Sequence, residues 1–428
     1  MRKDLLTEDR PSIKLDSPAQ PLKQAPDQRG ASIALVAGTT VGAGILALPA
    51  MTQPAGFLPS TVMLMVVWGY ALVAALLLAE VNVFCMRRSG QANMGLLGMV
   101  ESTLGKPIAN VAGGAYLFLH YALLVAYLSQ GGDILSGGLA HLVGGAVPGW
   151  AGPTVFALIF GGLLYWGSDR LVAKFNSTFV GIVILTFMAL LVLSSTQVDP
   201  GELVHQNWPA ISPAISVMLV ALFYHNVVPV VATQLEGDLG KIRQSIVVGS
   251  VIPLLMFLIW NAVILGSMGG LASLSTGSEV LDPLAILRNN AESPGLSIVV
   301  SVFSEFAIAT SFIGFTYGLL DFLKDAFQVR EITSDNRLPF YSIVFLPALG
   351  LSTLNPNIFF TALDYAGAFS ISVLGGILPA IMAWTLRYRS PWQTSPQPLV
   401  PGGRGTLIIM VVLAVAVIAI QILTMMTG

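Results

Sequence analysis

The chain has 428 residues, of which 55% are hydrophobic and only 10% are charged, and its formal net charge is −2. Soluble domains carry roughly 25% charged residues, so this composition excludes an ordinary soluble globular protein. The mean hydropathy of +0.79 instead predicts an integral membrane protein. No basic stripe interleaved with aromatic residues is present, which argues against nucleic-acid binding.

Residues 1–30 form a polar tail before the first apolar segment. The tail is rich in proline, which predicts a disordered segment. Its acidic residues argue against a transit peptide, and the length of the apolar segment that follows argues against a cleavable signal peptide. We expect no cofactor and no metal site, because the four histidines are scattered without ligand spacing. The single cysteine, Cys85, excludes an internal disulfide.

The predicted fold class is an all-α polytopic membrane protein with eleven transmembrane helices. A helix needs about 20 apolar residues to cross a bilayer, and eleven segments of the chain satisfy this criterion. They cover residues 31–54, 58–84, 110–139, 151–167, 175–196, 211–234, 244–268, 297–320, 338–354, 357–386 and 406–427. Residues 387–405, which are rich in proline, form a cytoplasmic loop before the last span, 406–428.

The first span is interrupted at its centre by glycines. Gly42 and Gly44 lack a Cβ, so they allow the backbone to unwind and a ligand to approach it closely. Backbone amides freed at the start of the half-helix that contains Pro49 form an anion site, where the helix dipole is positive. A valine at Gly44 would therefore block binding while leaving the protein folded. The expected binding residues of this break are Thr39, Thr40, Gly42, Ala43, Gly44 and Ile45.

The sixth span contains a second break, Phe223-Tyr224-His225-Asn226-Val227-Val228-Pro229. Pro229 has no N–H, so the carbonyl of His225 loses its helical partner. The carbonyls of Phe223, Tyr224 and His225, beside Asn226, are then available to an ammonium group. A carboxylate site opposite an ammonium site describes an α-amino acid. Small residues also permit close helix packing, but a matched pair of breaks favours a transporter's substrate site.

The distribution of Lys and Arg predicts the orientation. With the N-terminus in the cytoplasm and eleven spans, all of the 20 basic residues except Arg288 fall on the cytoplasmic side. The two breaks then lie in the first helices of two five-helix halves of opposite orientation. We therefore expect a five-plus-five inverted repeat over residues 31–386, with one additional C-terminal helix.

At family level, residues 38–49, Gly-Thr-Thr-Val-Gly-Ala-Gly-Ile-Leu-Ala-Leu-Pro, resemble the signature of the hydroxy and aromatic amino acid permeases, the tyrosine- and tryptophan-specific transport proteins. Residues 223–249 resemble the branch found in cyanobacteria and plant plastids. The resemblance runs from about residue 30 to 386, and the N-terminal tail departs from it. It implies the amino acid–polyamine–organocation superfamily fold and proton-coupled uptake of tyrosine or tryptophan.

Polar residues inside the spans are further candidates, because a charge at mid-bilayer costs ~2.5–3.5 kcal/mol on insertion scales. Tyr116, His120, Tyr127 and Gln130 share one face of the third span, and this face either lines the substrate path or makes hydrogen bonds between helices. His225 can titrate near neutral pH, so it either carries the coupled proton or hydrogen-bonds the substrate.

Four other residues are candidates for ion or proton coupling: Glu80, Glu305, Thr310 and Ser311. Asp364, in the tenth span beside Tyr365, is the last polar candidate inside the spans. Glu80 also lies near Arg87, with which a local ion pair is expected. In the fold that the resemblance implies, Thr310 and Ser311 face the first break, where sodium-coupled relatives bind their ion. Hydroxyls that bond their own helix backbone are the alternative for both.

The sequence thus predicts a secondary active transporter for an aromatic amino acid, working by symport with a proton, in the inner (plasma) membrane. The alternatives are a permease for other neutral amino acids and an amino acid sensor that does not transport. Its partners are the amino acid, the proton and membrane lipid, with the oligomeric state left open. An enzyme is disfavoured, because the sequence contains no nucleophile–base constellation.

The orientation makes the first testable prediction. A reporter fused after Gly428 should be extracytoplasmic, because an odd number of spans separates it from a cytoplasmic N-terminus. Reporter activity on the two sides of the membrane measures this, and a cytoplasmic C-terminal reporter would exclude the eleven-span topology.

Overall fold

The computed structural model describes residues 28–42, 44–89, 94–196, 198–267, 284, 287, 294–329, 331–355, 358–389 and 398–427. Most of the predicted tail, Ala43 and Arg288 lie outside these residues. The described residues form helices and short connections, without a strand.

The first half of the chain forms α1 (Gln28–Thr40), α2 (Gly44–Thr52), α3 (Phe57–Ser89), α4 (Leu96–Leu104), α5 (Lys106–Val143), α6 (Ala151–Phe156), the π-helix η1 (Ala157–Gly161), α7 (Gly162–Trp166) and α8 (Asp169–Ser195). The connection to the second half contains the 3₁₀ turns η2 (Glu202–Val204) and η3 (Trp208–Ile211). The second half forms α9 (Ala214–Ala221), the 3₁₀ turn η4 (His225–Val227), α10 (Val228–Gln234), α11 (Leu239–Gly266), α13 (Pro294–Ala326), α14 (Ser334–Leu354), α15 (Ile358–Tyr365), the π-helix η6 (Ala366–Ile377), α16 (Leu378–Trp384), the π-helix η7 (Thr385–Arg389) and α17 (Gly403–Thr427).

Among the described residues, every predicted span lies largely on helix. Within the described part of the chain, nine helical segments are long and apolar enough to cross a membrane, and α1 with α2 makes a tenth when counted as one bent span. The remaining candidate, Ala151–Trp166, is apolar but shorter. The all-helical membrane fold is confirmed, whereas the count of eleven stays a prediction. The short helix α4, in the connection between the second and third spans, was not predicted.

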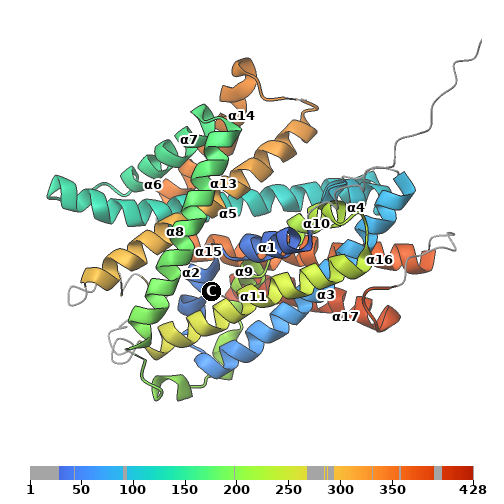
Figure 1. Ribbon diagram of the computed structural model, residues 1–428, viewed down its shortest axis with the longest axis horizontal. Coiled ribbons are helices and arrows are strands. Elements are labelled where there is room, and N and C mark those ends of the chain that lie inside the picture. Colours follow the sequence, from blue (N-terminus) through green and yellow to red (C-terminus); the bar gives the residue numbers. More distant parts are fainter. Residues whose placement is uncertain are drawn as a thin grey trace, which may run out of the picture.

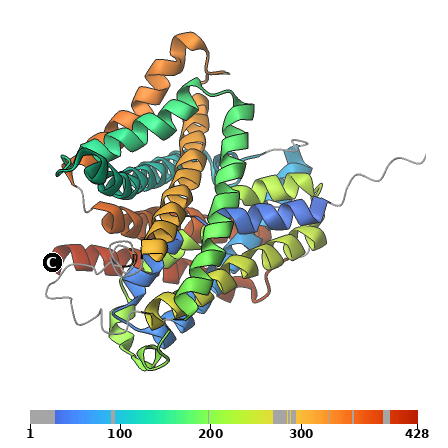
Figure 2. The same ribbon diagram turned by 60° about the vertical axis from the view of Figure 1, so that its left-hand side comes forward.

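The helices pack in two groups, as Figures 1 and 2 show. In one group, α1 and α3 lie along α11, and α10 lies beside α1. In the other, α8 and α13 run side by side, with α5, α6 and α14 packed around them. The segment α15–η6 joins the groups, because it contacts both α5 and α9.

The contacts between helices also follow the pattern that two structural repeats would produce: a contact between two helices has a counterpart between the corresponding helices of the other half. The packing of α1 on α11 has its counterpart in α9 on α3, and that of α8 on α13 in α15 on α5. The hairpin of α5 and α6 corresponds to that of α13 and α14. The outer half-helices α2 and α9 contact each other. The five-plus-five repeat stays a prediction, which this pattern supports.

A buried ion pair ties distant segments together near one end of α3. The guanidinium of Arg387 in η7 donates from Nε to Glu80 Oε1 at 2.7 Å and from Nη2 to Oε2 at 2.6 Å. The side chains of Arg387 and Glu80 are only 7% and 5% exposed. The backbone N–H of Leu399 also donates to Glu80, at 3.1 Å. The expected pair between Glu80 and Arg87 is therefore wrong, because Arg87 points instead to the carbonyl of Gly237.

The pair also holds the segment that leads into the last helix. Leu399 lies four residues before α17, and the carbonyl of Val400 accepts a bond from Arg387 at 3.4 Å. Further along α17, the Tyr70 hydroxyl of α3 donates to the Met410 carbonyl at 3.2 Å. Both the segment before α17 and α17 itself are thus attached to the rest of the protein.

Removing one charge of the buried pair should destabilise the fold. We expect Glu80→Gln to lower the free energy of unfolding by about 3–5 kcal/mol, because Arg387 is left buried without a counter-charge. Asp321→Asn is the control, since Asp321 is 67% exposed in its pair with Lys324, and it should cost about 0–1 kcal/mol. Denaturation of the purified protein in detergent measures both, and equal losses would contradict a special role for Glu80.

Candidate substrate site at the two broken helices

The first break separates α1 from α2, and the two helix axes meet at an angle of 50°. The N–H of Val41 still donates to Ala37 at 3.1 Å, and the N–H of Ile45 closes a tight turn on Gly42 at 3.1 Å. For the amides of Gly42 and Gly44, no hydrogen-bond acceptor is found among the described residues. Both amides lie at the N-terminal end of α2, where the helix dipole favours an anion.

The helix α13 covers the open side of Gly42. A Cβ built on Gly42 would lie 2.7 Å from Ser311 Oγ, and no other residue would come within 4 Å of it. Ser311 donates to the Ala307 carbonyl at 3.0 Å, and its side chain is also a hydrogen-bond partner of Tyr127 on α5. Ser311 and Tyr127, predicted from separate spans, are thus brought together at the first break.

Gly44 serves helix packing, and its expected contact with a ligand stays a prediction. A Cβ on Gly44 would lie 2.7 Å from the Cα of Ala221 at the end of α9. The backbones of α2 and α9 therefore touch at this point, and a larger residue would push the half-helices apart. Close packing at Gly44 holds the two breaks together. Gly44→Val would therefore disturb the fold as well as ligand binding, so it cannot test binding alone.

Three other predicted residues of the first break have their polar groups already engaged. The hydroxyls of Thr39 and Thr40 donate to the carbonyls one turn earlier in α1, at 2.8 Å each. The carbonyl of Ile45 accepts from the indole Nε1 of Trp260 at 3.0 Å. Sequence reasoning missed Trp260, although a Trp inside an apolar span signals an N–H that needs a partner.

The second break extends from Leu222 to Tyr224, between α9 and η4. The carbonyl of Tyr224 accepts from the N–H of Val227 at 3.2 Å, and the carbonyl of His225 accepts from Val228. The expectation that both are free is wrong, because the tighter 3₁₀ turn satisfies them before Pro229. The carbonyl of Phe223 alone, of the three, has no backbone donor among the described residues.

Residues 28–421 match the tryptophan/tyrosine permease family, which covers both breaks and nearly all of the helices described above. The chain belongs to this family. It is therefore a multi-pass membrane transport protein, as predicted, and the prediction that it is not an enzyme is confirmed by its family.

Individual relatives agree with this assignment. The permease is 28% identical to "Tyrosine-specific transport system 2" of Haemophilus influenzae, over 92% of this chain and 95% of the relative. It is 28% identical to the "Tryptophan-specific transport protein" of Pseudomonas aeruginosa, over 87% and 89%. Among solved structures, MhsT in complex with L-phenylalanine has a TM-score of 0.61 at 18% identity, covering 93% of this chain and 98% of that one. The last similarity shows a shared fold.

The permease has a buried histidine in the second break. His225 is 2% exposed, and among the described residues neither ring nitrogen makes a hydrogen bond of good geometry, although the backbone of Ala71 faces the ring. The ring stacks on Phe223 and on Tyr224, with centroids 5.2 and 5.4 Å away. A Cβ on Gly375 in η6 would lie 3.6 Å from His225 Nδ1. The adjacent Asn226 is exposed.

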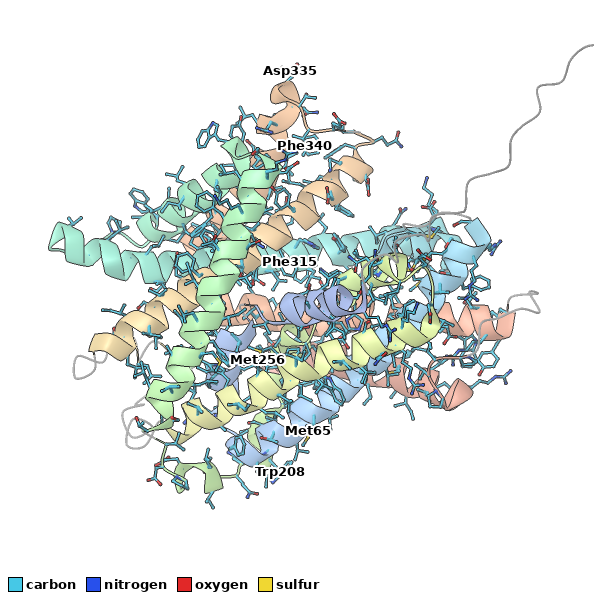
Figure 3. All side chains as sticks on the ribbon, in the orientation of Figure 1. Met65, Trp208, Met256, Phe315, Asp335 and Phe340 are labelled. Carbon is cyan, nitrogen blue, oxygen red and sulfur yellow. The ribbon has the colours of Figure 1, made fainter. Side chains whose placement is uncertain are left out.

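The predicted polar face of the third span lies against α13. The Tyr127 and His120 rings flank Phe315, with centroids 5.9 and 5.2 Å away, and Tyr116 stacks on Phe322 at 5.4 Å. Phe315 is labelled in Figure 3, where α5 and α13 cross. Aromatic side chains therefore line the contact between α5 and α13 up to Ser311.

The remaining coupling candidates are dispersed. Thr310 donates to the carbonyl of Ala307 at 3.0 Å, as the alternative interpretation expected. Glu305 is half-buried in the same helix, six residues before Ser311. Glu80 is held by Arg387. Of these residues, the contacts bring only Ser311 to the first break.

The two glycines of the first break should respond differently to an added methyl group. Gly44→Ala should lower the free energy of unfolding by about 1–3 kcal/mol, because its Cβ meets the backbone of Ala221. Gly42→Ala meets only a hydroxyl, so it should leave stability within about 1 kcal/mol of wild type but weaken binding of the transported amino acid about tenfold. Thermal denaturation with and without the amino acid measures both. Unchanged binding in Gly42→Ala would contradict the site.

Proposed function

We propose that this permease imports an aromatic amino acid, tyrosine or tryptophan, together with a proton. The observation that carries the proposal is the pair of broken helices, α1–α2 and α9–α10, which touch where Gly44 meets Ala221. The printed names of the relatives and the phenylalanine bound to MhsT support an aromatic substrate. Family membership supports transport in preference to sensing.

The first break recognises the substrate carboxylate. The amides of Gly42 and Gly44 have no acceptor among the described residues, and they stand at the positive end of the α2 dipole. A carboxylate accepts two such bonds without needing a charged side chain, which is costly to place in the bilayer interior. Ala43, between them, belongs to the same proposed site.

The second break recognises the ammonium group, and aromatic side chains recognise the ring. The carbonyl of Phe223 has no backbone donor among the described residues, so it can accept from an ammonium group. Tyr127 and Phe315 lie next to Ser311, which covers Gly42. A substrate bound to Gly42 through its carboxylate therefore has aromatic surface nearby for its side chain.

A proton is the proposed coupling ion. The hydroxyls of Thr310 and Ser311 both donate to Ala307, and these bonds do not decide between sodium and a proton. The proposal instead rests on His225, a titratable group in the break itself whose ring nitrogens are buried without a hydrogen bond of good geometry among the described residues. A change of its charge would be felt by the substrate and by the adjacent η6.

The proposed setting is the inner membrane, with the N-terminus cytoplasmic and the C-terminus outside. This orientation rests on the Lys and Arg distribution. The proposed transporter core is the five-plus-five repeat over residues 31–386, followed by the connection 387–405 and the last helix. The tail over residues 1–30 lies before this core.

Transport by purified protein in proteoliposomes tests the proposal. We expect counterflow with tyrosine and tryptophan but not with small neutral amino acids, and accumulation driven by an inward proton gradient without sodium. We also expect His225→Gln to retain exchange but lose gradient-driven accumulation, because glutamine keeps hydrogen bonding and cannot titrate. Radiolabelled uptake with an imposed pH step, with and without sodium, measures these outcomes.

Three results would contradict parts of the proposal separately. An absence of counterflow with every amino acid would favour a sensor. Strict sodium dependence would exclude the proton. Normal accumulation by His225→Gln would remove His225 from the coupling.

A further inference from the structure

An acidic side chain inside span 10 lies where three helices meet. Asp364 belongs to α15, two residues before the π-helix η6 begins. From α17, Gln421 Nε2 donates to Asp364 Oδ2 at 2.5 Å. From α9, Ser216 faces the same carboxyl. Figure 1 shows α15 next to α9, the half-helix that leads into the second break.

The carboxyl of Asp364 has no compensating charge. No cation of the described residues lies within ion-pair distance, and its Oδ1 is buried without a hydrogen-bond partner. Among the described residues, the side chains that face it are the neutral Ser216 and Gln421. The helix α5 also packs against α15 and carries Asp133.

Asp364 as a whole is partly exposed, but its Oδ1 is buried. A buried charge without a counter-charge is costly, and a carboxyl can avoid the cost by binding a proton. Glu80 provides the contrast within the same protein, because its carboxylate is paired with Arg387 and accepts a backbone N–H as well.

The contact between span 10 and α9 also fixes the position of α9. Gly367, three residues after Asp364, packs so closely that a Cβ there would overlap the carbonyl oxygen of Ser216. The helix α9 continues from Ser216 to Ala221, which touches Gly44 of the first break. Any change that separates Ser216 from span 10 would therefore move the point where the two breaks meet.

We propose that Asp364 is a proton-binding site of this permease and that its protonation controls the packing of α9 against span 10. This inference rests on the proton coupling proposed above. The neutral acid permits the close packing seen here. The carboxylate formed when the proton leaves needs water or a cation, so it favours a state in which α9 has moved away and water reaches the carboxyl.

The location also suggests how Asp364 and His225 cooperate. Asp364 lies two residues before η6, and His225 lies beside Gly375 near the end of η6. π-Helical turns are rare and frequently occur at functional sites. Asp364 lies six residues from the start of α15 and Gln421 six residues from the end of α17, so both are close to the face that the charge distribution places outside. Asp364 is thus the outer proton site, and His225 the one beside the substrate.

The test uses Asp364→Asn, which keeps the size of the side chain and stays neutral at every pH. We expect counterflow of radiolabelled tyrosine to be retained, and its pH dependence to be lost. Accumulation driven by a pH step should fall to the equilibrium level, and tyrosine should no longer carry protons into the liposomes, as measured with an internal pH-sensitive dye. Glu202→Gln, which removes a partly exposed carboxyl in η2, is the matched control and should behave as wild type.

A second variant tests the same site without removing the carboxyl. Gln421→Lys places a cation beside Asp364, which stabilises the carboxylate and should also abolish accumulation while exchange continues. Accumulation at the wild-type level in either variant would overturn the proposal, as would unchanged pH dependence of counterflow in Asp364→Asn. Wild-type protein without any amino acid counterflow would instead refute the proposed transport function.

Discussion

Backbone polar groups inside a bilayer must be satisfied by the protein, because lipid offers no hydrogen-bond partners. The structure around both broken helices depends on this constraint. Ile45 closes a turn on Gly42 and gives its own carbonyl to Trp260, while the 3₁₀ turn after Tyr224 satisfies two carbonyls of the second break. Among the described residues of the two breaks, the amides of Gly42 and Gly44 and the carbonyl of Phe223 are left without a backbone partner. In the proposed function, a ligand with a carboxylate and an ammonium group supplies these partners.

The same energetic argument separates structural charges from functional ones. Glu80 and Arg387 neutralise each other, and the pair gains further hydrogen bonds from the segment that precedes α17. Asp364 Oδ1 and the ring nitrogens of His225, by contrast, are buried without hydrogen-bond partners among the described residues, which is why the proposals assign the proton to these two side chains. Asp364 lies just before η6 and His225 lies beside it, which gives span 10 a central position in the proposed coupling.

Small residues decide how closely the helices that carry these groups approach one another. Gly44 brings α2 onto α9, and Gly367 brings span 10 onto the same helix. The helix α9 is thus held by backbone contacts on two sides, and the second break begins immediately after it. Movement of this short helix would alter the substrate site and the surroundings of Asp364 at once, which is the physical requirement for coupling.

The sequence by itself determined the helices and their interruptions. Apolar length defines a span, and glycine and proline interrupt one by local backbone chemistry, so the spans, both breaks and the shared face of Tyr116, His120 and Tyr127 were predictable. Only the tertiary structure decided which side chains meet. Arg387 lies 307 positions from Glu80, whereas Arg87, suggested by proximity in the chain, points elsewhere. Gly44 meets Ala221, and Asp364 meets Gln421. These contacts depend on the rotation and depth of each helix relative to its neighbours, which the packing of the whole bundle sets and the periodicity of one helix does not contain.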